Sequence, residues 1–353
     1  MSYAIKNETL MKERLSNIEL LRILLMYMVV ILHFVGHNVL SANNEFHFAD
    51  KNWISANLLE SFSCCAVDCF VLISGYFTIR FRLSKLVVFL LPIAFYELFI
   101  SVIFYKYYGV ISYTPFNYWF VKPYFLLMLV SPILNEGLRH IDKEKIIYFC
   151  LICTLLCYCN TPLSEGAGKT FQIFILLYAL GYSISHCRIS IGGGKIWGIV
   201  FSIVSLLIFL QTCVLDFLGH YRGVQSMSYN YNNILVIVAA IALFKFFTTL
   251  NIRSRFINWV SSSAFFVYII SENYNMYMHP NGMYDILHVQ EWESTSMYPI
   301  LILLASAAVF IVCICIDKVR IFLFGRVERY LCKSIDNIEG KILDFIYQKT
   351  SSL

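Results

Sequence analysis

The feature that most constrains this chain is its succession of long apolar runs. A helix that spans a bilayer needs about 20 predominantly apolar residues. Ten runs approach that length, at 18–39, 54–77, 86–105, 119–134, 146–159, 171–185, 196–218, 234–247, 256–278 and 297–316. The fourth, fifth, sixth and eighth runs are short, so flanking residues must complete them or the bilayer must thin there. The pattern predicts an all-α integral membrane bundle of about ten transmembrane helices.

Composition supports lipid as the main solvent for this chain. Apolar residues make up 59% and charged residues 14% of its 353 residues, against about 45–50% and about 25% in soluble domains. This balance excludes a soluble multidomain enzyme, a disordered chain and a disulfide-stapled secreted module. A net charge of +5 is too modest for a nucleic-acid binder. Most of the twelve cysteines lie in apolar runs, so packing is favoured and no metal site is predicted.

The basic residues between the runs predict the orientation, because cytoplasmic loops retain Lys and Arg. With the N-terminus inside, 21 Lys and Arg residues fall on the inner side and Arg22 lies within the first run. The outer side holds only Lys51, Lys106, Lys122, Lys169 and Arg222. We therefore predict that both termini are cytoplasmic. The chain divides into a cytoplasmic segment 1–17, a transmembrane domain 18–316 and a cytoplasmic, amphipathic basic tail 317–353.

The first run contains two costly ionisable residues, Arg22 and His33. Each such group costs at least about 2.5–3.5 kcal/mol at the centre of a spanning helix, so it needs a reason to be there. Eleven helical residues bring them to within about 20° of one face, roughly 16 Å apart along the axis. Arg22 could simply extend to the inner headgroups, and His33 could be an interfacial histidine. Their shared face favours a common functional role.

His37 follows His33 by one helical turn, a spacing that could in principle hold a metal. No acidic residue or third imidazole accompanies them in the sequence nearby. An interfacial role for His37 is therefore favoured.

The second run carries Asp68 near mid-membrane and Ser74-Gly75 near its cytoplasmic end. Asp68 should either pair with a cation or become protonated, and Arg22 is a possible structural partner. Ser74-Gly75 is either a helix end or a place where the backbone opens towards a ligand. Three further charges, Glu97, Lys122 and Glu272, also fall within or beside the runs.

Arg80, Arg82 and Lys85 form a compact basic cluster just after the second run. One interpretation is ordinary cytoplasmic topology, since Lys and Arg accumulate in inner loops. The other is a phosphate-binding surface, because guanidinium groups pair well with phosphate oxygens.

Several ordered motifs resemble membrane acyltransferase family 3, in the branch found in bacterial capsule and exopolysaccharide gene clusters. They are the Arg22-to-His33 spacing, the stretch 67–76 (VDCFVLISGY), Tyr118-Trp119-Phe120 with Ser131-Pro132, Ser228-Tyr229-Asn230, Val267-Tyr268-Ile269-Ile270, and 316–320 (IDKVR). Each motif is degenerate, but together they extend in order over most of the chain. The resemblance implies an enzyme that O-acylates surface polysaccharides or lipid-linked glycans.

The resemblance also implies roles for individual residues. His33 corresponds to the essential histidine and general base, and Arg22 to its companion. Asp68, Ser74 and Gly75 match the second motif, with Asp68 in a supporting role and Ser74-Gly75 near the cofactor. The cluster of Arg80, Arg82 and Lys85 stands where the family keeps residues that engage coenzyme A.

The chain departs from the family pattern in two places. The usual paired-Arg spacing is absent, and Arg82 with Lys85 is the nearest match. Many relatives close the Val-Tyr-Leu-Ile segment with His, where this chain has Ser271 and Glu272. These departures leave His33 as the candidate base.

The resulting expectation is a multi-pass O-acetyltransferase of the bacterial cytoplasmic membrane. Its co-substrate would be acyl-CoA, most simply acetyl-CoA, with no permanently bound cofactor, and its acceptor a surface polysaccharide or lipid-linked glycan. Membrane lipid is its other partner. The alternative is a non-enzymatic glycan or lipid carrier, or a flippase-like protein, because intramembrane charges also suit a translocation path.

Overall fold

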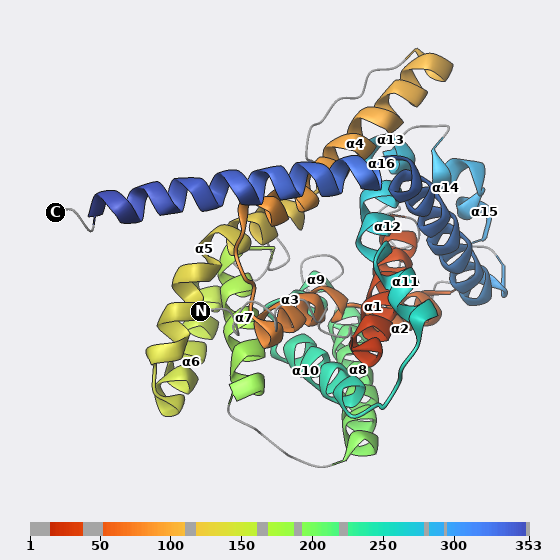
Figure 1. The fold of residues 1–353 in the computed structure, drawn as a ribbon. Coiled ribbons are helices and arrows are strands. Elements are labelled where there is room, and N and C mark those ends of the chain that lie inside the picture. The colour runs from red at the N-terminus through yellow and green to blue at the C-terminus, as the bar shows by residue number, and fades with distance from the viewer. Residues whose placement is uncertain are drawn as a thin grey trace.

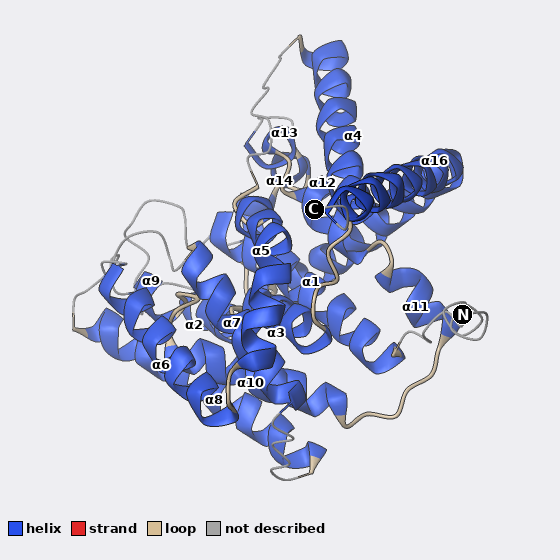
Figure 2. Cartoon of the chain, turned by 60° about the vertical axis from the view of Figure 1, so that its left-hand side comes forward, coloured by secondary structure: helices blue, strands red, loops and turns tan. Residues whose placement is uncertain are grey.

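The computed structural model describes residues 15–37, 52–109, 118–160, 169–186, 193–218, 225–278, 282–292 and 295–350. Every regular element within these ranges is a helix, as Figure 2 shows. The all-α prediction is therefore confirmed. The structural reason is that a backbone in lipid must satisfy its hydrogen bonds within each segment.

Five segments are long and apolar enough to span a membrane. They are Ser16–Gly36 within α1 (Ser16–His37), Trp53–Phe77 across α2 (Trp53–Ser63) and α3 (Ala66–Phe77), Leu83–Tyr108 (α4), Gly194–Phe217 (α8), and Tyr298–Ile342 within α16 (Tyr298–Thr350). Two shorter apolar helices are α7 (Phe171–His186) and α10 (Ile234–Thr248). The membrane assignment is supported, whereas ten spans and the orientation remain predictions.

The remaining helices are less apolar or shorter. They are α5 (Val121–His140), α6 (Lys143–Asn160), α9 (Gln225–Ser228), α11 (Arg255–Ser261), α12 (Ala264–Ser271), α13 (Tyr274–Met278), α14 (Met283–Ile286) and α15 (Val289–Trp292).

Two of the predicted spans are broken helices. The run 54–77 divides at Cys64-Cys65 between α2 and α3, and the run 256–278 divides into α11, α12 and α13. At the α11–α12 break, Ser262 and Ser263 interrupt the helix, and serine hydroxyls compete with the helical backbone for hydrogen bonds. Irregular backbone at membrane depth is tolerated where it lies within protein or faces a cavity.

Helix α1 lies near the centre of the bundle. It packs against α2, α3, α10, α11, α12 and α16, and Figure 1 shows these segments around it. Its side chains Leu21, Leu25 and Phe34 are completely buried. The Ser16 hydroxyl accepts a hydrogen bond from the Ser254 amide at 3.0 Å, which ties the start of α11 to the start of α1. Helix α1 therefore packs against parts of both broken spans, α2 and α3 of one and α11 and α12 of the other.

Helix α16 continues without interruption through Asp317, where the sequence places a boundary between the transmembrane domain and the tail. Figure 1 shows that the helix changes direction part-way and extends beyond the bundle. Asp317 is buried, and its Oδ1 atom accepts hydrogen bonds from Tyr96 of α4 and from Arg320, each at 2.8 Å. Arg320 also pairs with Glu328. These contacts fix α16 against α4. The tail is helical and exposes both Phe322 and basic side chains.

Candidate functional site

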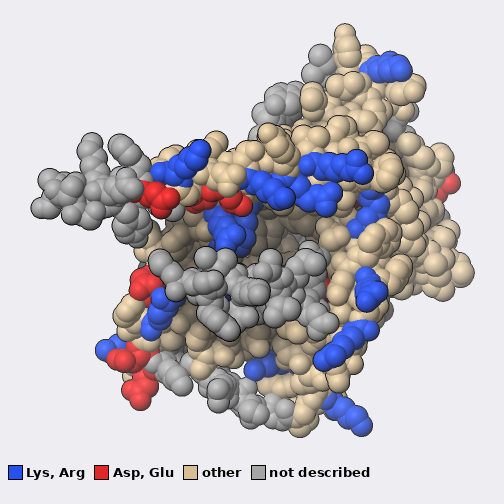
Figure 3. Space-filling view, viewed as in Figure 1, with Lys and Arg blue, Asp and Glu red and all other residues tan. Residues whose placement is uncertain are grey.

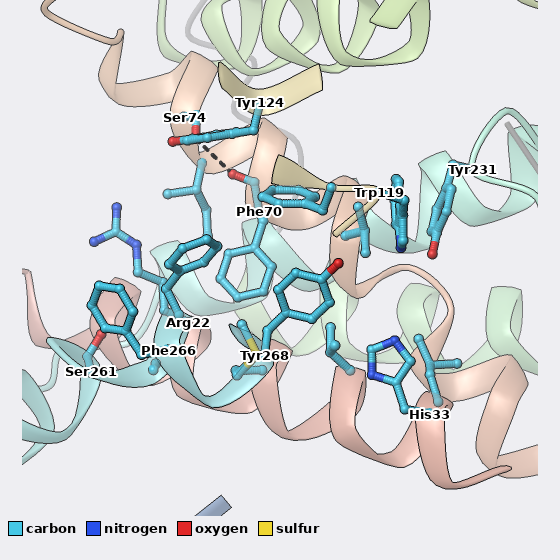
Figure 4. A pocket seen from close by; sticks show the side chains of 18 of the residues that line it. Arg22, His33, Phe70, Ser74, Trp119, Tyr124, Tyr231, Ser261, Phe266 and Tyr268 are labelled. Carbon is cyan, nitrogen blue, oxygen red and sulfur yellow. Dashed lines mark hydrogen bonds between the residues drawn. The ribbon is translucent and has the colours of Figure 1, made fainter. Parts of the chain in front are cut away.

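A cavity of about 590 Å³ runs beside α1. Its walls come from α1, α2, α3, α4, α5, α11 and α12, with further residues preceding α7 and α10. Both Arg22 and His33 line it, and Figure 4 shows them at opposite ends. The helical spacing thus brings the two predicted residues to one cavity, separated along its length rather than in contact.

His33 is held between an acidic and an aromatic side chain. Its Nδ1 atom lies 3.2 Å from Oε1 of Glu272, within ion-pair distance when the imidazole is protonated. Its ring stacks against Tyr268, with ring centroids 5.9 Å apart and an interplanar angle of 24°. The Glu272 side chain is only 9% exposed. His33 also lines the cavity, so its imidazole, with Glu272 beside Nδ1, can reach a molecule bound there.

The end of α12 is held in place by Tyr118, which precedes α5. The Tyr118 hydroxyl donates to the Ile269 carbonyl at 2.7 Å and accepts from the Asn273 side-chain amide at 3.3 Å. Ile269 and Asn273 flank the positions of Ser271 and Glu272. These bonds therefore orient the segment that carries the carboxylate facing His33.

The opposite end of the cavity contains Arg22. Its Nη1 atom is 3.0 Å from Oε1 of Glu19, and the Ser261 hydroxyl donates to the other oxygen of Glu19. The Arg22 side chain is 37% exposed, so its guanidinium is partly accessible. Glu19 also lines the cavity, so a carboxylate accompanies the guanidinium there.

Asp68 is not the partner of Arg22, contrary to one of the alternatives from the sequence. It is completely buried on α3 and does not line the cavity. Within the described part of the chain, neither of its carboxylate oxygens has a hydrogen-bond partner. An ionised carboxylate without a partner is costly in such a place.

Ser74 and Gly75 have different surroundings. Ser74 lines the cavity, and its hydroxyl donates to the Phe70 carbonyl and shares a hydrogen bond with the Tyr124 hydroxyl, each at 3.1 Å (Figure 4). Gly75 instead faces α7: a Cβ added there would lie 2.0 Å from the Tyr178 carbonyl oxygen. The structure brings Ser74 to the cavity and uses Gly75 for close helix packing.

The three residues of the predicted basic cluster do not all line the cavity. Lys85 lines the cavity, and its Nζ donates to the Arg80 carbonyl at 2.8 Å. Arg80 and Arg82 are exposed and lie outside the cavity lining. Figure 3 shows Lys and Arg side chains along α16 and around a hollow on the same face of the molecule.

The residues that line this cavity all lie within a segment of the chain that matches a known protein family. A family model described as an acyltransferase domain, for acyltransferase family 3, matches residues 15–318. The chain belongs to that family. The match begins just before α1, includes Arg22, His33 and Glu272, and ends within α16. No curated protein and no solved structure matches the chain.

The contact of Glu272 with His33 is not predicted by the sequence of this acyltransferase. The sequence marks Glu272 only as an intramembrane charge and as a departure from the family pattern. A useful signal was available, because an ionisable residue in a membrane usually has a partner of opposite charge or a functional role. His33 and Glu272 are two such residues, but no local spacing connects them.

The cavity of this acyltransferase has two chemically distinct ends. Arg22 supplies a cation at one end, and His33 beside Glu272 supplies an imidazole next to a carboxylate at the other, while Lys85 is a second cation in the lining. Among the described residues, no group of three or more His, Cys, Asp or Glu side chains is arranged to hold a metal ion. The nine cysteines whose side chains the structure describes are all free thiols. The arrangement is suited to binding an anionic donor and deprotonating a second substrate.

Proposed function

We propose that this acyltransferase moves an acetyl group from acetyl-CoA to a hydroxyl of a cell-surface or lipid-linked saccharide. The acceptor class is that of the capsule and exopolysaccharide branch, and the membrane is the bacterial cytoplasmic membrane. The observation that carries the proposal is one cavity that joins Arg22 and Lys85 to the His33–Glu272 pair. A donor with phosphates and a long arm can occupy both regions at once.

The charged groups of the donor hold it in the cavity. The phosphates of coenzyme A lie against Lys85 and the accessible guanidinium of Arg22, because charge-assisted hydrogen bonds to phosphate are strong. The predicted orientation, with the start of α1 in the cytoplasm, makes this the cytoplasmic end. The same proposal includes ten transmembrane helices and cytoplasmic N- and C-termini. The pantetheine arm then extends along α1 and brings the thioester to the region of His33.

Transfer takes place at the His33 end. Nε2 of His33 takes the proton of the acceptor hydroxyl as its oxygen attacks the thioester carbonyl. The carbon–sulfur bond breaks, the acetyl group forms an ester with the saccharide, and the imidazolium returns the proton to the departing coenzyme A thiolate. Glu272 stabilises the imidazolium and holds the ring through Nδ1. Arg22, roughly 16 Å away along the helix, acts on the coenzyme arm rather than on the reacting carbonyl.

The rival function is a glycan or lipid carrier or a flippase-like protein, since an elongated intramembrane cavity with charged residues also suits a translocation path. The two functions differ in their use of the thioester. The enzyme releases free coenzyme A when an acceptor is supplied, whereas a carrier does not.

The test compares cells with and without the protein by mass spectrometry of their surface polysaccharide. We expect loss of acetyl mass when the protein is absent, and its return with the wild-type protein but not with His33→Ala at equal membrane abundance. In parallel, the purified protein should release coenzyme A from acetyl-CoA in proportion to the acetylated saccharide. An unchanged polysaccharide mass, with no coenzyme A release, would reject the enzyme.

A further inference from the structure

The end of the cavity near His33 contains a polar and aromatic wall that the proposed chemistry leaves unused. It consists of Glu60 from α2, Trp119 before α5, and Tyr229 and Tyr231 before α10. Figure 4 shows Trp119 and Tyr231 side by side at the end occupied by His33. This wall is well placed to meet whatever approaches the catalytic imidazole.

Glu60 has an unused hydrogen-bonding atom. Its Oε2 is buried and has no hydrogen-bond partner within the part of the chain that the structure describes. Leaving a buried polar atom unsatisfied is costly, and more so if the group is charged. Because Glu60 lines the cavity, a ligand in the cavity can supply the missing donor.

The surroundings of Glu60 are ordered. The Tyr229 hydroxyl donates to the Asn57 side-chain oxygen at 3.0 Å, which fixes the segment before α10 against α2. Tyr229 and Tyr231 line the same cavity as Glu60. The Glu60 carboxyl therefore belongs to a built site rather than to a mobile surface.

The aromatic pair adds a rigid apolar surface. Trp119 and Tyr231 stack with ring centroids 5.1 Å apart and an interplanar angle of 20°. The Lys169 ammonium lies 5.1 Å from the centroid of the Trp119 ring and helps to fix it by a cation–π contact. Tyr and Trp combine an apolar body with a polar edge, so they match ligands that are themselves apolar on one side and polar on another.

We infer that Glu60 and the Trp119–Tyr231 pair form the subsite for the acceptor saccharide. Glu60 accepts a hydrogen bond from an acceptor hydroxyl, and the aromatic pair packs against the C–H groups of the sugar ring. A sugar ring has both the hydroxyl groups and the apolar C–H surface that this wall requires. A metal ion fits less well, because the described residues here supply no cluster of ligands for it. The inference rests on the proposed acetyl transfer to a saccharide.

The test measures acceptor and donor kinetics separately, with the full-length protein in lipid nanodiscs. The donor is radiolabelled acetyl-CoA, and the acceptors are oligosaccharides from the surface polysaccharide of the source cells, deacylated with mild alkali. For Glu60→Gln we expect the KM for oligosaccharide to rise about tenfold, because an amide nitrogen, which cannot accept a hydrogen bond, replaces one of the two carboxyl oxygens. Glu60→Leu should raise it further, and the KM for acetyl-CoA should stay within twofold of the wild type in both variants.

Two further variants separate recognition from structural damage. Tyr231→Leu removes one ring of the stacked Trp119–Tyr231 pair and leaves the Glu60 carboxyl in place, and we expect it also to raise the oligosaccharide KM. Asp216→Asn is the matched control, because Asp216 is a buried acid on α8 outside the cavity lining. It should change neither KM. Oligosaccharide binding to the inactive His33→Ala protein, with and without Glu60→Gln, gives a second readout that needs no turnover.

The outcomes distinguish the two proposals. An active wild-type enzyme whose oligosaccharide KM is unchanged by Glu60→Gln and Glu60→Leu overturns the subsite and leaves the acetyl transfer standing. A rise in the acetyl-CoA KM alone also overturns it, because Glu60 would then contact the donor. A wild-type protein that transfers no label and releases no coenzyme A overturns both.

Discussion

The Nδ1 atom of His33 on α1 lies 3.2 Å from Oε1 of Glu272, at the end of α12. The two residues lie far apart in the sequence, and both fall within the segment that matches acyltransferase family 3. A carboxylate at this distance from Nδ1 can stabilise a protonated imidazole. Under the proposed mechanism we therefore expect Glu272 to act as a positioning residue for His33.

The first prediction concerns this contact. Glu272→Gln keeps the shape of the side chain but removes the charge that supports the imidazolium. We expect kcat for acetyl transfer to fall at least about tenfold with little change in either KM, since the loss acts in the transition state. Glu272→Asp should recover part of kcat. A raised acceptor KM at normal kcat would instead make Glu272 a substrate-binding residue.

The second prediction separates His33 from His37, one helical turn away. His33→Ala should lower the transfer rate by roughly 10²–10⁴-fold, the usual contribution of a general base. His37→Ala should have a much smaller effect, because the cavity lining includes His33 and the expected role of His37 is interfacial. Equal activities of the two variants, at equal abundance in the membrane, would contradict the mechanism.

The third prediction divides the basic cluster. Lys85 lines the cavity, whereas Arg80 and Arg82 are exposed outside it. We expect Lys85→Gln to raise the acetyl-CoA KM about tenfold, because this substitution removes a charge-assisted contact with a phosphate. Arg82→Gln should raise it by less than threefold, because Arg82 lies outside the cavity lining. Reversal of all three residues to Glu should abolish donor binding in a correctly inserted protein. Equal effects of the two single changes would indicate that coenzyme A lies farther out on the surface.

The fourth prediction tests whether Gly75 serves packing or the cofactor. Gly75→Ala would place a Cβ 2.0 Å from the Tyr178 carbonyl oxygen, so α3 and α7 must move apart. Overpacking of this kind typically costs about 1–3 kcal/mol, and we expect a lower Tm in detergent. Gly137→Ala is the matched control, because nothing lies within 4 Å of a Cβ there. A normal Tm together with a raised acetyl-CoA KM would assign Gly75 to the cofactor instead.

The fifth prediction concerns Asp68, which is fully buried and has no hydrogen-bond partner among the described residues. Asp68→Asn keeps the shape and removes the cost of burying a charge. We expect a Tm equal to or above that of the wild type, measured by thermal unfolding in detergent. If Asp68→Asn lowers the Tm strongly, the carboxylate must be ionised and paired in the folded protein.

Local sequence was sufficient to predict the helical, membrane-embedded class. Apolar runs determine it because a polypeptide in lipid has few ways to satisfy its backbone hydrogen bonds. The relation between Arg22 and His33 was also predictable, since eleven residues of helix determine both their common face and their separation. The ordered motifs predicted the family that the match over residues 15–318 confirmed.

Tertiary structure alone decided the partners of these residues. His33 pairs with Glu272 of another helix, and Asp68 does not pair with Arg22, whose own partner Glu19 lies one helical turn away on α1. Tertiary structure also turned Gly75 towards α7. Helical periodicity states which side chains share a face, but it does not state which other helix meets that face. That choice depends on the packing of the whole bundle, which joins residues that no local spacing relates.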